Sequence, residues 1–459
     1  MKIIVAGDGK VGNLLTEQLA KEGHDIVVID RDSSVLRHSQ EKLDVAIVVG
    51  NCASSAVQTE AGIGGADLMI AVTSSDEVNL LSALVARKLG CSHLVARVRS
   101  QEYDREMNML KRDFGLSFTI NPEKSAANEI FRLIQFPSFL KRNSFAGGRA
   151  EMVEFKVTRE TGLAGKRLDQ TPDILGRKAL VCAVDRNNEV VIPSGSFQIQ
   201  EGDKVSLTAA TADLPFLLQR LGMKVQRIRK VMIVGGSSTA AYLAESLVGA
   251  GVSVTIIEQN HARCIALCES IPKATIIEGD GSVQSLLKEE GITDIDAVVT
   301  LTGMDEENLM ISLFANSVGV PKTITKVNRL EYLDVLAKAN IDTIVSPKLL
   351  TANEIVRYVR AVDQSREGSI DTLYNMNNGK AEALGFTVPS AGSFLNVPFT
   401  ELKLQPGILI ATIIRNQQVI TPAGNDYMTP GDSVIVIANT EKAISNLTDI
   451  FADSEAGPA

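Results

Sequence analysis

Three glycines near the start of the chain have a spacing that brings a peptide backbone close to a phosphate group. Gly7, Gly9 and Gly12 form the pattern Gly-x-Gly-x-x-Gly directly after a short apolar run. In this motif the first glycine permits a tight turn, the second lets the backbone approach a pyrophosphate, and the third lets a helix pack against the strand. Unpaired amide groups at the start of that helix favour an anion. The motif therefore predicts a phosphate-binding loop.

An acidic residue follows the glycine loop where such sites contact a ribose. Asp30 ends the next apolar run, and its carboxylate would accept hydrogen bonds from both ribose hydroxyls and repel a 2′-phosphate. We therefore expect NAD or an adenosine nucleotide rather than NADP, although Arg31 weakens the exclusion of NADP slightly. The alternative interpretation is a glycine turn that has a structural role and no ligand.

More polar side chains follow the later apolar runs of the same segment. Asn51 and Cys52 follow the third run, Thr73 and Ser74 follow the fourth, and Arg97 ends the fifth. Ligands of open α/β sheets bind at the carboxyl ends of the strands, so we expect these side chains at the same site. A cation at the fifth run could pair with a phosphate, or it could be an ordinary surface cation.

No arrangement of side chains typical of catalysis is visible. A dehydrogenase needs a proton-transfer group or an activated nucleophile beside the nicotinamide. The histidines do not recur between the two halves and form no dyad, so we expect surface roles for His24, His38, His93 and His261. Cys264 and Cys268 have the spacing of two metal ligands on a helix, but a second ligand pair is missing, and we interpret them as small apolar residues. The sequence indicates binding without catalysis or a metal.

The composition and charge narrow the classes of protein further. A chain of 459 residues is too long for one hydrophobic core, so we expect roughly two to four domains. An apolar share of 45% and a charged share of 22% are typical of soluble proteins, and a net charge of −9 argues against a nucleic-acid binder. Five cysteines without a framework indicate free thiols in a reducing cytosol. No secretory signal or apolar run of roughly 20 residues is present, so we expect a cytoplasmic protein whose membrane role would come through a partner.

The sequence contains two copies of one pattern. The two copies keep an almost constant separation over more than a hundred residues, which indicates an internal duplication. The matching pairs are 2–9 with 230–236, 26–30 with 254–258, 50–51 with 279–280, 67–73 with 296–302, 127–130 with 352–355, and 192–203 with 421–432.

The glycine loop of the second copy is degenerate. Gly235 keeps the turn, but Ser237 and Ala240 replace the second and third glycines, while Glu258 keeps the ribose acid and Lys326 keeps the cation. Hydroxyl groups could still hold phosphate, and alanine is often accepted at the last position, so binding and an empty structural copy both stay open. The full set predicted to bind the cofactor is Gly7, Asp8, Gly9, Lys10, Val11, Gly12, Asp30, Arg31, Asn51, Cys52, Thr73, Ser74, Arg97 and Glu258.

Strand-like and helix-like segments alternate in each copy, which is typical of a doubly wound parallel sheet covered by helices. In the first copy we expect strands at 2–6, 26–29, 45–49, 67–72 and 94–98. Each Rossmann-like domain is followed by a small α+β domain. The expected boundaries are a Rossmann nucleotide-binding domain at 1–120, crossover helices at 121–142, a small domain at 143–227, a second Rossmann-like domain at 228–345, crossover helices and a linker at 346–370, and a second small domain at 371–459.

Both crossover segments begin with a helix start signal. Asn121-Pro122-Glu123 and Ser346-Pro347-Lys348 each place a capping residue before a proline at the first helical position. Both small domains are expected to close with a helix-like segment. The polar stretch 364–380 is typical of a linker before the last small domain.

Several of these motifs together resemble the TrkA family, the peripheral regulatory subunits of bacterial Trk potassium-uptake systems, whose repeating unit is the RCK domain. The resemblance rests on the tandem arrangement and on the segments 7–12, 29–30, 71–79 and 121–123, and it covers essentially the whole chain. This sequence departs from the family pattern at Asn51, where many relatives carry Asp. Asparagine can still form hydrogen bonds with ribose or adenine.

The resemblance implies a function and an assembly. Such proteins bind NAD(H), and in several cases ATP or ADP, at the glycine loop, and they form a ring beneath a potassium-translocating membrane subunit of the TrkH type, which they gate. Their crossover helices exchange between partner domains, so here the two copies are expected to pair within one chain. Two other classes stay open: an NAD-dependent oxidoreductase and a redox-sensing transcriptional regulator. The missing catalytic group opposes the first, and the acidic charge and the absence of a helix-turn-helix segment oppose the second.

Overall fold

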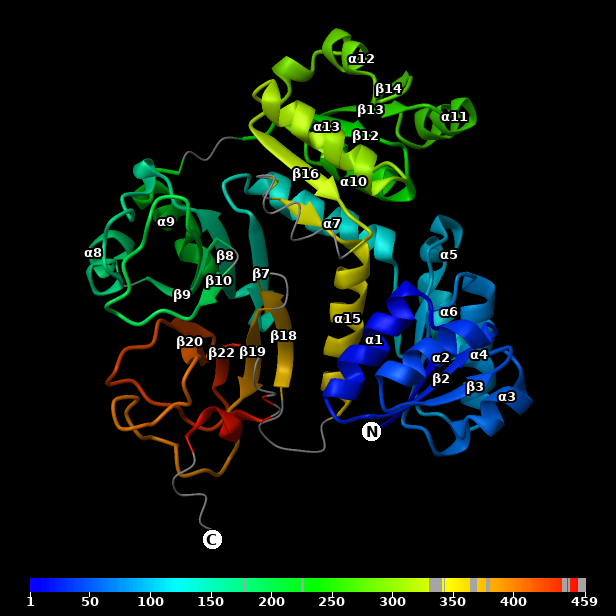
Figure 1. Cartoon of the computed structure of the whole chain (residues 1–459), viewed down its shortest axis with the longest axis horizontal. Helices are drawn as coiled ribbons and strands as arrows, with labels where there is room; N and C mark the ends of the chain where they lie inside the picture. The colour runs from blue at the N-terminus through cyan, green and yellow to red at the C-terminus, as the bar shows by residue number, and fades with distance from the viewer. Residues whose placement is uncertain are drawn as a thin grey trace.

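The computed structural model describes residues 1–176, 178–187, 189–223, 227–329, 341, 343–363, 370–376, 380–439, 444 and 446–452. Within these residues the chain forms two six-stranded sheets and two five-stranded sheets, which alternate along the sequence. In Figure 1 the larger unit that contains α1 lies at the lower right and the one that contains α10 lies at the top. The two small sheets lie together at the left.

The first larger unit is a parallel sheet with the strand order β3-β2-β1-β4-β5-β6, and all its pairings are parallel. This order reverses between β1 and β4, as in doubly wound folds. The five predicted strands are confirmed, and β6 is an addition. The elements are β1 (Lys2–Ala6), α1 (Lys10–Lys21), β2 (Asp25–Asp30), α2 (Ser33–Lys42), β3 (Ala46–Val49), α3 (Ser55–Glu60), η1 (Ile63–Gly65), β4 (Leu68–Ala71), α4 (Asp76–Lys88), β5 (His93–Arg97), α5 (Gln101–Arg105), α6 (Met107–Phe114) and β6 (Phe118–Ile120).

The second larger unit repeats this topology with the strand order β14-β13-β12-β15-β16-β17. The predicted duplication therefore extends to the strand order. The elements are β12 (Lys230–Val234), α10 (Ser238–Gly249), β13 (Ser253–Glu258), α11 (His261–Ser270), β14 (Thr275–Glu278), α12 (Gln284–Glu289), η6 (Ile292–Asp294), β15 (Ala297–Thr300), α13 (Asp305–Ser317), β16 (Lys322–Lys326) and β17 (Ile344–Val345).

The central strands of each parallel sheet have side chains packed on both faces. In β1, Ile4 and Ala6 pack in one apolar layer, whereas Ile3 and Val5 pack in the layer on the other face. Successive side chains of a strand point to opposite faces, so a strand covered on both sides needs an unbroken apolar run. The run at the start of the chain meets this requirement.

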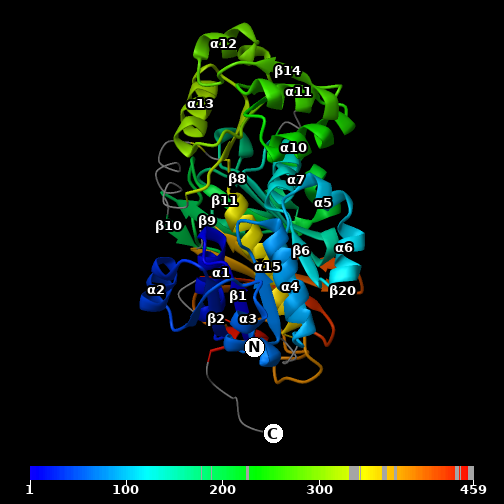
Figure 2. The same ribbon diagram turned by 90° about the vertical axis from the view of Figure 1, so that its right-hand side faces the viewer.

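Two long helices cross between the two copies. α7 (Pro122–Gln135) follows the first sheet in sequence but packs on α10 of the second unit, through Ala127, Ile130 and Leu133. α15 (Pro347–Val362) follows the second sheet but packs on α1 of the first unit. Figures 1 and 2 show α15 beside α1 and α7 beneath α10. The expected pairing of the two copies within one chain is therefore confirmed.

The two small domains are antiparallel sheets that pack against each other through Phe145, Met152 and Ile437 among other residues. The same ion pair between a partly exposed arginine and a buried aspartate recurs in both domains, Arg186 with Asp203 and Arg415 with Asp432, each at 2.8 Å. The first has β7 (Lys141–Phe145), η2 (Ala146–Gly148), β8 (Ala150–Lys156), η3 (Arg159–Thr161), η4 (Leu168–Gln170), α8 (Pro172–Leu175), β9 (Ala179–Arg186), β10 (Glu189–Val191), β11 (Lys204–Ala210), η5 (Thr211–Asp213) and α9 (Leu214–Arg220). The second has β18 (Ile370–Met376), β19 (Ala381–Thr387), β20 (Ile408–Arg415), β21 (Gln418–Ile420), β22 (Ser433–Asn439) and η9 (Leu447–Ile450).

Two local predictions need correction. The predicted linker 364–380 contains β18, which pairs with β19 and buries Ile370 and Met376. Residues 364–369 and 377–379 of that stretch lie outside the described part. The polar composition had favoured a linker, but the backbone of β18 pairs with β19. Ser346 precedes α15 as predicted, but its hydroxyl accepts no capping bond, whereas the Asn121 side chain accepts one from Lys124 at 3.0 Å. The helix-like segment expected after β22 falls largely on residues 440–443 and 445, which lie outside the described part, and η9 follows them as a 3₁₀ turn.

Candidate functional site

A cavity of about 590 Å³ opens at the carboxyl ends of the first parallel sheet, where the strand order reverses. Ligands of doubly wound sheets bind at this position, and the volume lies in the range typical of small-molecule sites. Of the residues predicted to bind the cofactor, those that line the cavity are Gly7, Gly9, Lys10, Val11, Asp30, Arg31, Cys52, Thr73, Ser74 and Arg97. Asp8, Gly12, Asn51 and Glu258 are not among its lining residues.

Each glycine of the first loop has a distinct steric environment. Gly7 has a φ of +100°, and a Cβ there would lie 2.9 Å from the backbone of Thr73. A Cβ on Gly12 would lie 1.8 Å from the Gly7 carbonyl oxygen. A Cβ on Gly9 would meet no atom within 4 Å. Packing within the protein therefore explains why positions 7 and 12 need glycine, while the space over Gly9 is open to a ligand.

The carboxylate of Asp30 is held in place by backbone amides. Its Oδ2 accepts a hydrogen bond from the Asp8 amide at 2.7 Å, and its Oδ1 accepts one from the Asp32 amide at 3.0 Å. The Asp8 side chain is buried and accepts a hydrogen bond from the Ser39 hydroxyl at 2.6 Å. Asp8 thus connects the glycine loop to α2, while Asp30 stays on the cavity wall.

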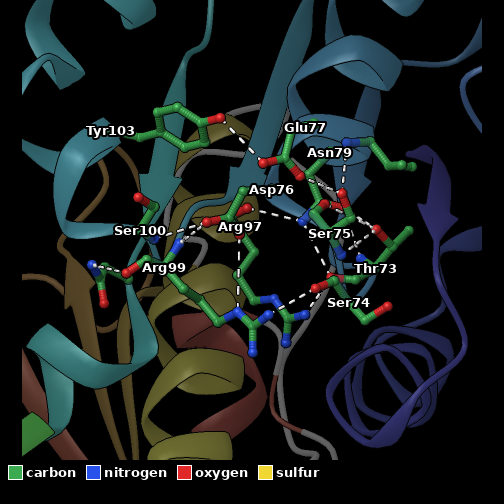
Figure 3. Close-up of polar contacts among 12 residues, drawn as sticks. Thr73, Ser74, Ser75, Asp76, Glu77, Asn79, Arg97, Arg99, Ser100 and Tyr103 are labelled. Atoms are coloured by element: carbon green, nitrogen blue, oxygen red, sulfur yellow. Dashed lines mark hydrogen bonds and ion pairs between the residues drawn. The ribbon is translucent and has the colours of Figure 1, made fainter. Parts of the chain in front are cut away.

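A buried amide connects the ends of two neighbouring strands (Figure 3). Asn79, on α4, accepts hydrogen bonds from the Thr73 amide at 2.8 Å and the Thr73 hydroxyl at 2.7 Å. Its amide group donates to the Arg97 carbonyl at 2.9 Å. The loop after β4 and the end of β5 are therefore positioned together by one side chain.

A carboxylate beneath the cavity organises the next loop. Asp76 accepts hydrogen bonds from the Arg99 and Ser100 amides, both at 2.8 Å, and the Arg99 guanidinium donates to the Ser74 carbonyl at 2.7 Å (Figure 3). Prediction from the sequence missed Arg99 as a lining residue. Its position next to the end of β5 is a weak signal on its own.

Three ionisable groups at the cavity have pKa values shifted by burial, and for Cys52 burial raises the pKa of the thiol. Burial lowers the pKa of Arg97, and the charge of Arg99 lowers it further. The Arg97 guanidinium donates to the Thr73 carbonyl, while its Nε has no hydrogen-bond partner among the described residues. Burial raises the pKa of Glu123, whose Oε2 is also buried without a partner there. Within the described part of the chain, the half-buried Arg97 guanidinium forms no ion pair with a carboxylate, and this favours an anionic ligand.

Residues from the second half of the chain complete the cavity wall. Asn328 follows β16, and Pro347 and Lys348 begin α15. The Lys348 ammonium donates to the Asn328 carbonyl. Prediction from the first glycine motif could not identify these residues, because only the exchange of α15 brings them to the first unit.

The equivalent loop of the second copy is held by its own side chains. Glu258 accepts hydrogen bonds from the Gly236 amide at 2.6 Å and the Asn260 amide at 2.7 Å. Arg263 donates to the Gly236 carbonyl at 2.5 Å, and the Ser237 hydroxyl caps α10 by accepting from the Ala240 amide at 3.4 Å. The Ser237 oxygen therefore caps α10, while its O–H group can still donate to a phosphate.

The histidines were expected at the surface, and His24 differs from this expectation. The His24 side chain is largely buried, 7% exposed, and its Nδ1 lies 3.4 Å from the N-terminal amine. Burial lowers the pKa of His24. His93 contacts the Tyr358 hydroxyl at 3.3 Å, His261 is exposed beside Glu278, and the His38 side chain lies outside the described part.

Cys264 is buried and Cys268 is exposed, and both are free thiols. Across the described residues, no group of three or more His, Cys, Asp or Glu side chains has the arrangement of a metal site. None of the helices in the part of the chain that the structure covers has the length and apolar character needed to cross a membrane.

The chain matches two family models. The TrkA-N domain matches residues 3–122 and again 231–347, and the TrkA-C domain matches 152–222. The chain is 31% identical to the Trk system potassium uptake protein TrkA of Haemophilus influenzae, over 99% of each chain. It is also 31% identical to the TrkA of Halomonas elongata, over 98% of each chain.

Solved structures share the fold. The RCK domain of GsuK superposes with a TM-score of 0.61 at 18% sequence identity, covering 96% of this chain and 92% of that one. A GsuK channel bound to NAD has a TM-score of 0.60 at 18% identity and covers 96% of this chain and 77% of that one. At this level of identity the likeness shows the fold, with two parallel-sheet units and two small domains in one chain.

Proposed function

Since this chain belongs to the TrkA family, we propose that it is the regulatory subunit of a Trk-type potassium uptake system and that its first glycine loop binds NAD(H), ATP or ADP. Its relatives are named for potassium uptake, and a channel with the same fold is described as bound to NAD. The observation that carries the proposal is the cavity at the strand reversal, where Asp30 and Arg97 lie on one wall with the glycine loop.

The chemistry of the cavity matches a nucleotide with several phosphates. The loop amides and the start of α1 would bind the phosphates, and the Asp30 carboxylate would accept hydrogen bonds from the ribose. Arg97 would pair with phosphate, which would also give a partner to its Nε, an atom without a hydrogen bond among the described residues. The remaining predicted residues that line the cavity would contact the ligand through their backbones or short side chains.

The subunit acts on potassium transport through a membrane partner of the TrkH type. It is a cytoplasmic protein, bound peripherally to the inner face of the membrane, and it self-associates into a ring through its RCK domains. Ligand binding changes the angle between the paired units, and this requires that the ligand binds one arrangement more tightly than another. It is a regulator rather than an enzyme. The competing interpretation is an NAD-dependent oxidoreductase, which would need a catalytic group that the sequence does not show.

Calorimetric titration with NADH, NAD, ATP and ADP tests the proposal. The Asp30→Ala variant should weaken binding about tenfold or more, because hydrogen bonds to a charged group contribute about 1.5–3 kcal/mol. Glu258→Ala is the matched control, since it removes the equivalent acid from the second copy, and it should leave the first site unchanged. Unchanged affinity in Asp30→Ala, with the fold intact by circular dichroism, would place the ligand elsewhere.

A further inference from the structure

Both crossover helices begin at the cavity of the first glycine loop. Pro122 and Glu123 at the start of α7 line it, and so do Pro347 and Lys348 at the start of α15. By sequence α15 belongs to the second copy. The cavity is therefore enclosed by both halves of the molecule, and a ligand there would contact both.

The equivalent positions of the two helix starts carry opposite charges. Glu123 and Lys348 both follow the proline of their helix, so the duplication has diverged at this position. Lys348 lies at a cavity that also has the cations Arg97 and Arg99, from the first copy, on its wall. With Lys10 and Arg31, five cations line a cavity whose only lining carboxylates among the described residues are Asp30 and Glu123. This excess of positive charge favours a ligand with more than one phosphate group.

Lys348 is positioned by a chain of contacts within the second copy. Its ammonium donates to the Asn328 carbonyl, and the Asn328 amide donates to Asp305 at 2.9 Å. Asp305 begins α13 and is almost fully buried. The Lys348 ammonium is therefore held by the loop after β16 of the second unit, and the same residue lines the cavity of the first unit.

The body of α15 continues from the cavity to the small domains. Ile355 and Val356 of α15 pack in the same apolar layer as Val11 of α1, the helix that follows the glycine loop. Farther along, Arg357 donates to the Tyr374 hydroxyl at 3.1 Å, which in turn donates to the Ser144 carbonyl at 2.7 Å. One helix thus connects the cavity with β18 of the second small domain and β7 of the first (Figure 1).

We propose that Lys348 of the second copy contacts the phosphates of a nucleotide bound in the first copy, and that this contact couples the number of ligand phosphates to the position of α15. The inference rests on the proposed function of the glycine loop. An ammonium forms a charge-assisted hydrogen bond with phosphate, so a ligand that reaches Lys348 binds best when α15 is closed on the cavity. A ligand with fewer phosphates stabilises this arrangement less, which is a differential affinity of the kind that shifts a conformational equilibrium.

Titrations of ADP and AMP into Lys348→Ala and wild type test this contact. The variant should lose about tenfold in ADP affinity, the effect of one hydrogen bond between charged groups. It should lose much less for AMP, whose single phosphate is expected at the glycine loop. Lys348→Arg should restore part of the ADP affinity. Lys273→Ala, at an exposed position in the second copy, removes the same charge and should bind ADP like wild type.

A second readout separates contact from a purely structural role. In wild type, ADP should slow amide hydrogen exchange in the first turns of α15, and in Lys348→Ala this protection should be lost while Lys273→Ala keeps it. Equal loss of AMP and ADP affinity together with a lower melting temperature of the ligand-free variant would overturn the proposal, because it would show that Lys348 only supports the helix.

The two proposals fail in different ways. If wild type binds none of these nucleotides, or Asp30→Ala binds them unchanged, then the proposed function of the glycine loop is wrong. If wild type binds ADP and Asp30→Ala does not, but Lys348→Ala binds ADP like wild type, then the loop is the site and the contact from α15 is refuted.

Discussion

At the scale of single residues, a buried asparagine shapes the candidate site without lining it. Asn79 is fully buried and joins Thr73 to the end of β5, and Asn308 does the same for Thr302 and the end of β16 in the second copy. The Thr–Asn pair recurs at the same spacing in both copies. That recurrence was the signal in the sequence that could have identified this residue as a support of the site.

Replacing Asn79 by alanine should therefore impair both stability and binding. The Thr73 amide and the Arg97 carbonyl would lose their partner, and each buried group left unsatisfied costs about 1–3 kcal/mol. Urea unfolding should show this loss, and calorimetry should show weaker nucleotide binding, since Thr73 and Arg97 both line the cavity.

The duplication provides a control for this variant. Asn308→Ala removes the same hydrogen bonds from the second copy, so its stability should fall by a similar amount while the first site keeps its affinity. If Asn308→Ala weakened binding as much as Asn79→Ala, the effect on binding would come from general destabilisation rather than from the position of Thr73.

At the scale of elements, the glycine loop and α1 form one tightly packed unit. The Gly12 position leaves no room for a side chain, because a Cβ there would lie 1.8 Å from the Gly7 carbonyl oxygen. The second copy carries Ala240 at the equivalent position, and there Arg263 donates to the Gly236 carbonyl, while Glu258 accepts from the loop amide as Asp30 does in the first copy. The two loops have therefore diverged in packing, although their strand order is the same.

Gly12→Ala should force the loop away from α1. We expect a stability loss of about 1–3 kcal/mol, typical of overpacked sites, and weaker nucleotide binding. Thermal unfolding and calorimetry would measure both. Ala240→Gly is the reverse change in the second copy and should leave nucleotide binding intact. Wild-type affinity in Gly12→Ala would show that the loop can relax without moving the phosphate-binding amides.

At the scale of the whole molecule, the two copies are interlocked by their crossover helices. Ile130, Leu133 and Ile134 of α7 are buried against the second unit, and Ile355 and Val359 of α15 are buried against the first. Fully burying one such side chain contributes about 1.5–3 kcal/mol. Neither copy can therefore complete its core without a second copy.

Separate halves of the chain should consequently associate. Residues 1–227 expressed alone should form a dimer, because α7 of each copy can occupy the place that α15 leaves beside α1 of the other. Light scattering after size-exclusion chromatography would measure the mass. Mixing or coexpression with residues 228–459 should give a one-to-one complex. A stable, well-folded monomer of 1–227 would contradict this account of the core.

Much of the architecture could be predicted from the sequence, because its causes are local. The apolar run before Gly7, the glycine spacing and the acid at Asp30 depend on strand burial and backbone geometry, which act over short segments. The repeated segments predicted two equal units, and the structure confirms them with the same strand order. The strand within the supposed linker was missed, because pairing with β19 is a non-local interaction.

The rest of the site was decided by the tertiary structure alone. Lys348 and Asn328 are more than 200 residues from the glycine loop in the sequence, and only the exchange of α15 places them at its cavity. The burial that shifts the pKa values of Arg97 and Glu123 likewise arises from elements that meet only in the folded chain. The sequence alone determined where a phosphate can approach the backbone, since that depends on a few adjacent residues. Which charges surround that phosphate depends on how distant helices pack, and no local pattern contains this information.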